Sequence, residues 1–113
     1  MIEGYNSGRM TVDGKRYHHD LKIIRNRVVP DWWRREDHRL DREDVEDILS
    51  SNPDVVVVGI GYAGNMRVSE SLRSVLSQRS IRLIAESTNE AMLTFNRLSS
   101  EGKNVAGAFH LTC

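Results

Sequence analysis

Short apolar stretches separated by turn residues fill the first third of the chain, a pattern that is typical of β-strands. The pair Asp13-Gly14 divides the segment 9–18, and an Asp-Gly pair favours a two-residue hairpin turn because both positions need positive φ. A second strand pair is expected within residues 21–29, ending before Pro30 because proline cannot donate to a β-ladder. The sequence therefore predicts an N-terminal β-hairpin region.

From residue 41 onward, stretches with a helical spacing of apolar residues alternate with short continuous apolar runs. Asp41 is expected to cap the first helix of this part. The valines at 55–58 form an uninterrupted run, which indicates a strand buried on both faces. Residues 55–59 and 81–85 should be parallel neighbours joined by a right-handed crossover. A closing strand is expected at residues 105–111.

Together these elements predict an α/β fold, a small three-layer sandwich with a mostly parallel mixed sheet and the hairpin region at one side. The chain has 113 residues, and domains usually have roughly 100 to 150. We therefore expect residues 1–113 to form a single domain.

Sixteen basic residues balance sixteen acidic ones, so no net field draws the molecule toward nucleic acid or an anionic membrane surface. The start of the chain, MIEGYNSGRM, does not resemble a signal peptide, and the valine run is far shorter than the roughly 18 residues of a membrane helix. Cys113 is the single cysteine, which argues against an internal disulfide or a cysteine-based metal cage. We therefore expect a soluble cytoplasmic protein that binds neither nucleic acid nor membranes.

Residues 59–64, Gly-Ile-Gly-Tyr-Ala-Gly, follow the valine run and spell GxGxxG, the signature of dinucleotide-binding turns. In such turns the third glycine lies in the first turn of the next helix, whose amides reach the pyrophosphate. Here the helical spacing begins only at Val68 and the expected cap is Ser69. Because the loop is too long by about one helical turn, we expect no NAD and no other cofactor.

Two other interpretations of this turn stay open. Its glycines either let the chain turn and pack closely, or its free amides and Arg67 form a pocket for a small anion. In the second case Thr88 would cap the next helix beside the same cleft. Asn96 would either bond to a neighbouring loop or face that cleft. The candidate ligand-binding residues are Gly59, Gly61, Tyr62, Asn65, Arg67, Thr88 and Asn96.

Aromatic and basic residues adjoin at positions 32–35, and such residues often dominate protein interfaces. The candidate partner surface consists of Trp32, Trp33, Arg34 and Arg35. The alternative is that one tryptophan packs in the core while its neighbour is partly exposed.

Neither a metal site nor a catalytic centre emerges from the residue spacing. His18 and His19 are adjacent in an expected strand and would point to opposite faces, so they are not expected to share a metal ion. His110 in the closing strand is expected to be structural. No nucleophile, base and orienting acid can be grouped by spacing, and whether the chain is an enzyme is left open.

Gly59-Ile60-Gly61 and the run from Thr88 to Ala106, with its Thr-x-x-Ala-x-x-x-aromatic-Asn pattern, carry a resemblance. They resemble a domain family that includes the adipogenesis-associated protein and the mitochondrial complex I assembly factor. The resemblance implies a three-layer domain with an antiparallel last strand, and it implies no established reaction. Phe95 and Lys103 depart from the tyrosine and arginine that are frequent in the family.

These observations favour a protein-interaction module with an assembly or regulatory role and without established catalysis. The alternative is that the Gly-x-Gly turn binds a small anionic ligand. Such a ligand could also be the substrate of an enzyme. The sequence names neither the partner, the ligand nor the oligomeric state.

Overall fold

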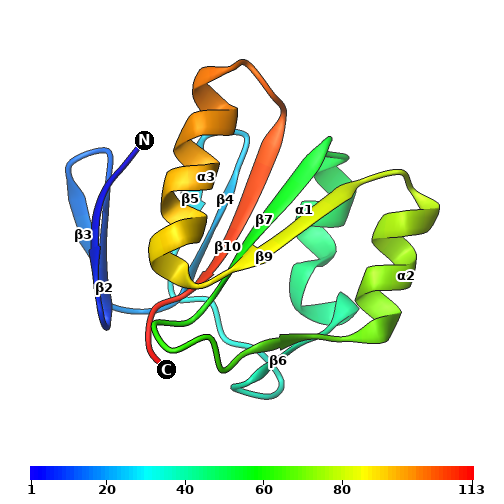
Figure 1. The fold of residues 1–113 in the computed structure, drawn as a ribbon, viewed down its shortest axis with the longest axis horizontal. Coiled ribbons are helices and arrows are strands. Elements are labelled where there is room, and N and C mark those ends of the chain that lie inside the picture. The colour runs from blue at the N-terminus through cyan, green and yellow to red at the C-terminus, as the bar shows by residue number, and fades with distance from the viewer.

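The structure, a computed structural model, describes residues 1–113 and is shown in Figure 1. The N-terminal part contains β1 (Ile2–Asn6), β2 (Arg9–Val12), β3 (Lys15–Tyr17), β4 (Leu21–Ile24), β5 (Arg27–Val29) and β6 (Arg39–Leu40). A 3-10 helix, η1 (Arg42–Val45), leads into α1 (Glu46–Ser51), β7 (Val55–Ile60) and β8 (Arg67–Val68). The chain ends with α2 (Glu70–Gln78), β9 (Arg82–Glu86), α3 (Thr88–Ser100) and β10 (Val105–His110).

A five-stranded mixed sheet with the strand order β5-β4-β10-β7-β9 forms the centre of the molecule. The strand β7 pairs in parallel with both β9 and β10, so the predicted parallel pairing of residues 55–59 with 81–85 is confirmed. The strands β4 and β5 continue the sheet by antiparallel pairing. Because β7 lies between two strands and under helices on both faces, its valines are all buried, as their uninterrupted run indicates.

The direction of the last strand requires a correction. The expectation was an antiparallel last strand, but β10 is antiparallel only to β4 and is parallel to β7. The reason is the connection: α3 carries the chain back across the sheet, so β10 enters in the same direction as β7 and β9. The strand also lies inside the sheet rather than at its margin, and all six of its residues are buried.

The sheet separates two apolar clusters, which gives the predicted three layers. Val57 and Phe109 point to the face covered by α3 and by the sheet β1-β2-β3. Val56 and Val58 point to the opposite face, where they pack with buried residues of α1 and α2 such as Leu72. The alternation of strand side chains thus divides one apolar run between two cores.

The N-terminal hairpin forms at the predicted turn. Asp13 and Gly14 have φ of 49° and 81°, as a two-residue turn between β2 and β3 needs. The strand β1 was not predicted, and it extends this hairpin to three strands. None of the helices is long and apolar enough to cross a membrane.

Candidate functional site

The register of the central sheet brings an aspartate and a histidine together. Leu21 of β4 lies opposite Phe109 of β10, and one further step of this antiparallel register places Asp20 opposite His110. Oδ2 of Asp20 lies 2.7 Å from Nδ1 of His110. Its other oxygen, Oδ1, accepts the backbone N–H of Leu111 at 2.7 Å. The aspartate therefore joins the start of β4 to the end of β10.

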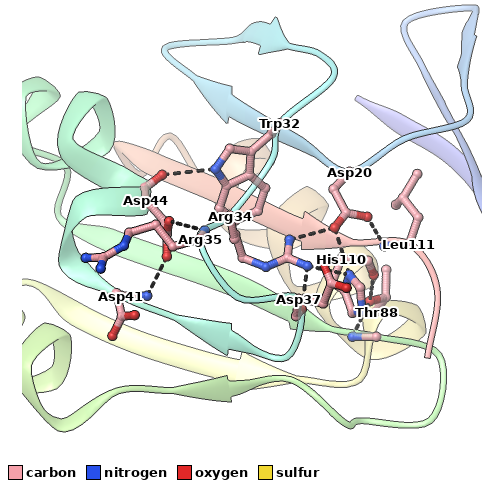
Figure 2. A network of polar contacts seen from close by, with 11 residues as sticks. Asp20, Trp32, Arg34, Arg35, Asp37, Asp41, Asp44, Thr88, His110 and Leu111 are labelled. Carbon is pink, nitrogen blue, oxygen red and sulfur yellow. Dashed lines mark hydrogen bonds and ion pairs between the residues drawn. The ribbon is translucent and has the colours of Figure 1, made fainter.

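Arg34 completes this polar network, which Figure 2 shows from close by. Its Nη1 lies 2.6 Å from Oδ2 of Asp20, and its Nη2 donates to the carbonyl of Asp37 at 2.6 Å. The arginine side chain is only 3% exposed, and its guanidinium carbon lies 5.1 Å from the centre of the Trp32 ring. The ion pair is therefore an interior one, in which neither charge can lose its partner without a penalty.

The surroundings of Asp20 keep its carboxyl group ionised. Burial alone would raise the pKa of Asp20. The hydrogen bonds from His110, from the Leu111 amide and from Arg34 outweigh burial and hold that pKa below its ordinary value. An ionised carboxylate only accepts hydrogen bonds, so we assign the proton of the His110 ring to Nδ1, which then donates to Asp20.

Two nitrogen atoms of this network have no partner. Nε2 of His110 and Nε of Arg34 are buried without a hydrogen bond. Such groups are few in native proteins because each one carries a desolvation cost. The ring of His38 approaches that of His110 edge to face, with the ring centres 5.8 Å apart.

A cavity of about 300 Å³ lies beside this network. Asp20, Arg34 and His110 contribute to its wall together with His19, Trp33 and His38. The Trp33 side chain is 73% exposed, and its ring centre lies 5.5 Å from that of His19. The cavity is therefore polar on its inner side and aromatic at its rim.

The Gly-x-Gly turn after β7 does not line this cavity and is covered by Thr112 and Cys113, which do. The amide of Tyr62 donates to the carbonyl of Thr112 at 3.1 Å, and the amide of Asn65 donates to that of Cys113 at 3.2 Å. The amide of Gly61 donates to the Thr88 hydroxyl at 2.9 Å. The expectation of free amides at this turn is therefore corrected, because the chain's own oxygen atoms bind them.

Close packing explains the first two glycines of this turn. A Cβ atom at Gly61, which has φ of +107°, would lie 2.5 Å from the carbonyl carbon of Cys113. A Cβ atom at Gly59 would lie 2.9 Å from the Thr88 hydroxyl. Both positions exclude a side chain, which is the structural interpretation of the motif.

Thr88 and Asn96 also hold the fold together. Thr88 is not the helix cap that we expected; that position is Ser87, and the Thr88 hydroxyl donates to the carbonyl of His110 at 2.6 Å. The Asn96 amide accepts the N–H of Ile2 at 3.0 Å and donates to its carbonyl at 2.8 Å. We expected Asn96 either to bond to a neighbouring loop or to face the cleft, but its partner Ile2 belongs to the strand β1. Ligand contacts by Tyr62, Asn65 and Arg67 stay predictions.

The predicted partner surface divides into buried and exposed residues. Trp32 is 6% exposed, and its Nε1 donates to the carbonyl of Asp44 at 3.0 Å. Trp33 and Arg35 are exposed, and Arg35 pairs with Glu43 at 3.2 Å. The alternative prediction, one packed tryptophan beside an exposed one, is therefore confirmed.

The contact between Asp20, Arg34 and His110 was not predicted from the sequence. His110 was predicted to be structural, which its bond to Asp20 supports, but its unpartnered Nε2 was not predicted. The one available signal was the position of both residues at strand ends, an aspartate before β4 and a histidine at the end of β10.

Comparison with known proteins finds a family and several solved structures. The family described as a protein of unknown function (DUF498/DUF598) matches residues 2–110. The conserved hypothetical protein PH1505 from Pyrococcus horikoshii OT3 is 27% identical, with a TM-score of 0.85 and coverage of 100% of this chain and 99% of that one.

Two further structures are more distant in sequence. A protein from Bartonella henselae described as an outer membrane protein is 23% identical, with a TM-score of 0.82 and coverage of 99% and 94%. A protein from Bordetella pertussis described as a Mth938-like domain is 20% identical, with a TM-score of 0.66 and coverage of 98% and 85%. At this identity the two likenesses show a shared fold.

Proposed function

Because the chain belongs to the DUF498/DUF598 family of proteins of unknown function, we propose a function from its own geometry: it is a protein-interaction module with an assembly or regulatory role. The observation that carries this proposal is Trp33, which is 73% exposed at the rim of the cavity. Its contact surface would consist of Trp33, the adjoining cavity residue His19 and the exposed Arg35, which follows Arg34 in the chain. A cytoplasmic location and kinship with the adipogenesis-associated protein and the complex I assembly factor stay predictions.

The support lies in how the neighbours of Trp33 are held. Trp32 is buried and hydrogen-bonded to the Asp44 carbonyl, and Arg34 is buried and paired with Asp20. Because the residues on both sides are anchored, the backbone at Trp33 is already ordered before a partner binds. Preorganisation of this kind lowers the entropic cost of association, and tryptophan is enriched among the residues that dominate binding energy.

The alternative function, binding of a small anion at the Gly-x-Gly turn, is not favoured. It needed backbone amides that point outward, and the amides of Gly61, Tyr62 and Asn65 donate to atoms of the same chain. Only exposed side chains such as those of Tyr62 and Arg67 would be left for a ligand.

Affinity capture from cells with a matched pair of variants tests the interaction proposal. Leu93→Ala is the control because Leu93, on α3, is also a largely exposed apolar side chain, at 61%. The wild type and Leu93→Ala should retain the same partner protein. Trp33→Ala should retain at least roughly tenfold less, as expected for a residue that contributes about 2 kcal/mol to binding.

The wild type, Leu93→Ala and Trp33→Ala must all be folded for this comparison. Their thermal unfolding curves check this. Equal capture by Trp33→Ala and the wild type would contradict the proposal, and so would a chain that retains no partner. If Trp33→Ala does capture less of the partner, calorimetry with the purified partner measures how much binding free energy the substitution removes.

A further inference from the structure

The strand β9 is an open edge of the central sheet. It pairs with β7 on one side and ends the strand order on the other, and it has five residues without proline or glycine. The strand at the other margin, β5, has only three residues. Natural proteins usually protect sheet margins by short strands, by proline or by covering segments, because an open edge pairs readily with another strand.

The backbone direction at this edge follows from one hydrogen bond. The amide of Arg82 points inward, toward β7, because it donates to the carbonyl of Asp54 at 3.0 Å. Backbone groups alternate in direction along a strand. The N–H and C=O groups of Leu83 and Ala85 therefore point to the open side of the sheet.

The side chains of β9 carry opposite charges at its two ends. Arg82, Ile84 and Glu86 share the face covered by α3, where Ile84 packs against the apolar cluster and Glu86 accepts the Thr94 hydroxyl at 2.6 Å. Neither Arg82 nor Glu86 forms an ion pair within the chain. The sequence Arg-Leu-Ile-Ala-Glu is thus complementary in charge to itself when read in the opposite direction.

We propose that two copies of this chain pair through β9 in antiparallel orientation around a two-fold axis at Ile84, so that the two central sheets become one continuous sheet. In this register Leu83 lies opposite Ala85 of the second copy, and these are the residues whose backbone groups point outward. They form hydrogen-bonded pairs, while Ile84 meets its own counterpart in a closer pair without such bonds. Arg82 then lies opposite Glu86 of the second copy at both ends.

One register gives the outward backbone groups of Leu83 and Ala85 hydrogen-bond partners and also pairs Arg82 with Glu86. An unrelated strand would not match both features, so a second copy of the chain is the favoured partner. An interface of this kind is isologous, the commonest symmetry of soluble dimers. A five-residue strand pair alone buries less than the roughly 1,200 Å² of stable interfaces, so the flanks of α2 and α3, which both pack on β9, have to contribute. We therefore expect a dimer that dissociates on dilution.

Charge reversal at the two ends gives a sharp test. Sedimentation velocity over a concentration series should show dimers of the wild type. Arg82→Glu places acid opposite acid, and Glu86→Arg places base opposite base, so each variant alone should be monomeric at concentrations where the wild type is dimeric. An equimolar mixture of the two should dimerise again, because both ends of the mixed pair are then complementary.

Arg9→Glu is the control, since Arg9 is an exposed arginine on β2, outside the central sheet. It should dimerise like the wild type. Amide hydrogen exchange gives a second readout: the amides of Leu83 and Ala85 should be slowed at high protein concentration, and the amide of Arg82 should not change. A wild type that stays monomeric at all concentrations, or a mixture of folded variants that fails to dimerise, would overturn the proposal.

The proposal does not depend on the contact surface at Trp33. Trp33 lies in the segment between β5 and β6 and lines the cavity with Asp20 and His110, beside β4 and β10, and neither of these strands neighbours β9. Trp33→Ala should therefore leave the dimer intact, and the charge reversals should leave partner capture intact.

Discussion

Asp20 is the residue on which the polar contacts beside the cavity converge. Its two carboxylate oxygens contact the His110 ring, the Leu111 amide and the Arg34 guanidinium, all within 2.7 Å. These three groups belong to the end of β10 and to the segment that carries Trp33. The carboxylate thus fixes two distant parts of the chain at once, and its charge offsets a buried arginine.

Asp20→Asn is expected to destabilise the protein by about 3–5 kcal/mol, because it keeps the shape of the side chain but leaves the buried Arg34 charge unpaired. Urea unfolding measures the loss. The pKa of Asp20 is lower in the folded protein than in the unfolded chain, so its stabilising effect is complete above about pH 4 and is lost as the pH falls through the folded pKa. The difference between the two proteins should therefore shrink in acid.

Glu101→Gln provides the comparison at the surface. Glu101 pairs with Arg97 at 3.7 Å, and both side chains are well exposed. Removal of such a pair usually changes the free energy of unfolding by less than about 1 kcal/mol. Similar losses in Asp20→Asn and Glu101→Gln would contradict a stabilising role for the interior network.

At the scale of elements, the turn after β7 and the last residues of the chain depend on each other. Tyr62 and Asn65 donate to the carbonyls of Thr112 and Cys113, and Gly61 has no room for a side chain. The end of β10 and the turn are also joined by Thr88, which bonds to both. The first two glycines of GxGxxG therefore reflect close packing, whereas a Cβ atom at Gly64 would meet only the Ile60 side chain, at 3.7 Å.

Gly61→Ala is expected to destabilise the protein more than Gly14→Ala. Both glycines have positive φ, +107° and +81°, so both substitutions strain the backbone. A methyl group at Gly14 meets nothing within 4 Å, whereas at Gly61 it would collide with the backbone of Cys113. The free energy of unfolding, measured with urea, should fall by about 1–3 kcal/mol more in Gly61→Ala than in Gly14→Ala. Equal losses in the two variants would show that Thr112 and Cys113 move aside without a cost in stability.

The elements that could be predicted are those whose signal is local. The hairpin at Asp13-Gly14 follows from turn chemistry, and β7 follows from its continuous apolar run. The strand β1 was missed because its buried residues Ile2 and Tyr5 are three positions apart and its register is irregular between Ile2 and Gly4, so strict alternation is absent. The predicted direction of β10 was wrong. That direction depends on where α3 returns the chain to the sheet, and no local sequence pattern contains this information.

The whole molecule is organised around β10, which places the two apolar clusters on its two faces and the polar network at its end. The partners of this network, Asp20 and His110, lie 90 residues apart in sequence. Their contact depends on the register of β4 against β10, and that register is set by side-chain packing over the whole sheet. For this reason an exposed tryptophan beside a packed one could be predicted from the sequence, but the contacts between Asp20, Arg34 and His110 could not.

Tyr5 links the outer three-stranded sheet to the end of β10, and this contact depends on the protonation of its phenol. The hydroxyl donates to the carbonyl of Leu111 at 2.6 Å. Burial is the main cause that raises the pKa of Tyr5 from 10.0 to about 12. The neutral phenol is thus favoured in the folded protein, and its stabilising effect is complete below about pH 10 and lost as the pH rises toward 12.

Tyr5→Phe should therefore flatten the fall of stability in alkali. At pH 8 the variant should be less stable than the wild type, because the Leu111 carbonyl loses one of its two donors and keeps only the N–H of Gly8, at 2.7 Å. Between about pH 10 and 12 the wild type should lose stability faster than the variant, so that the two unfolding curves approach each other. Parallel curves for the wild type and Tyr5→Phe across this range would show that the phenol ionises equally well in the folded and unfolded chains.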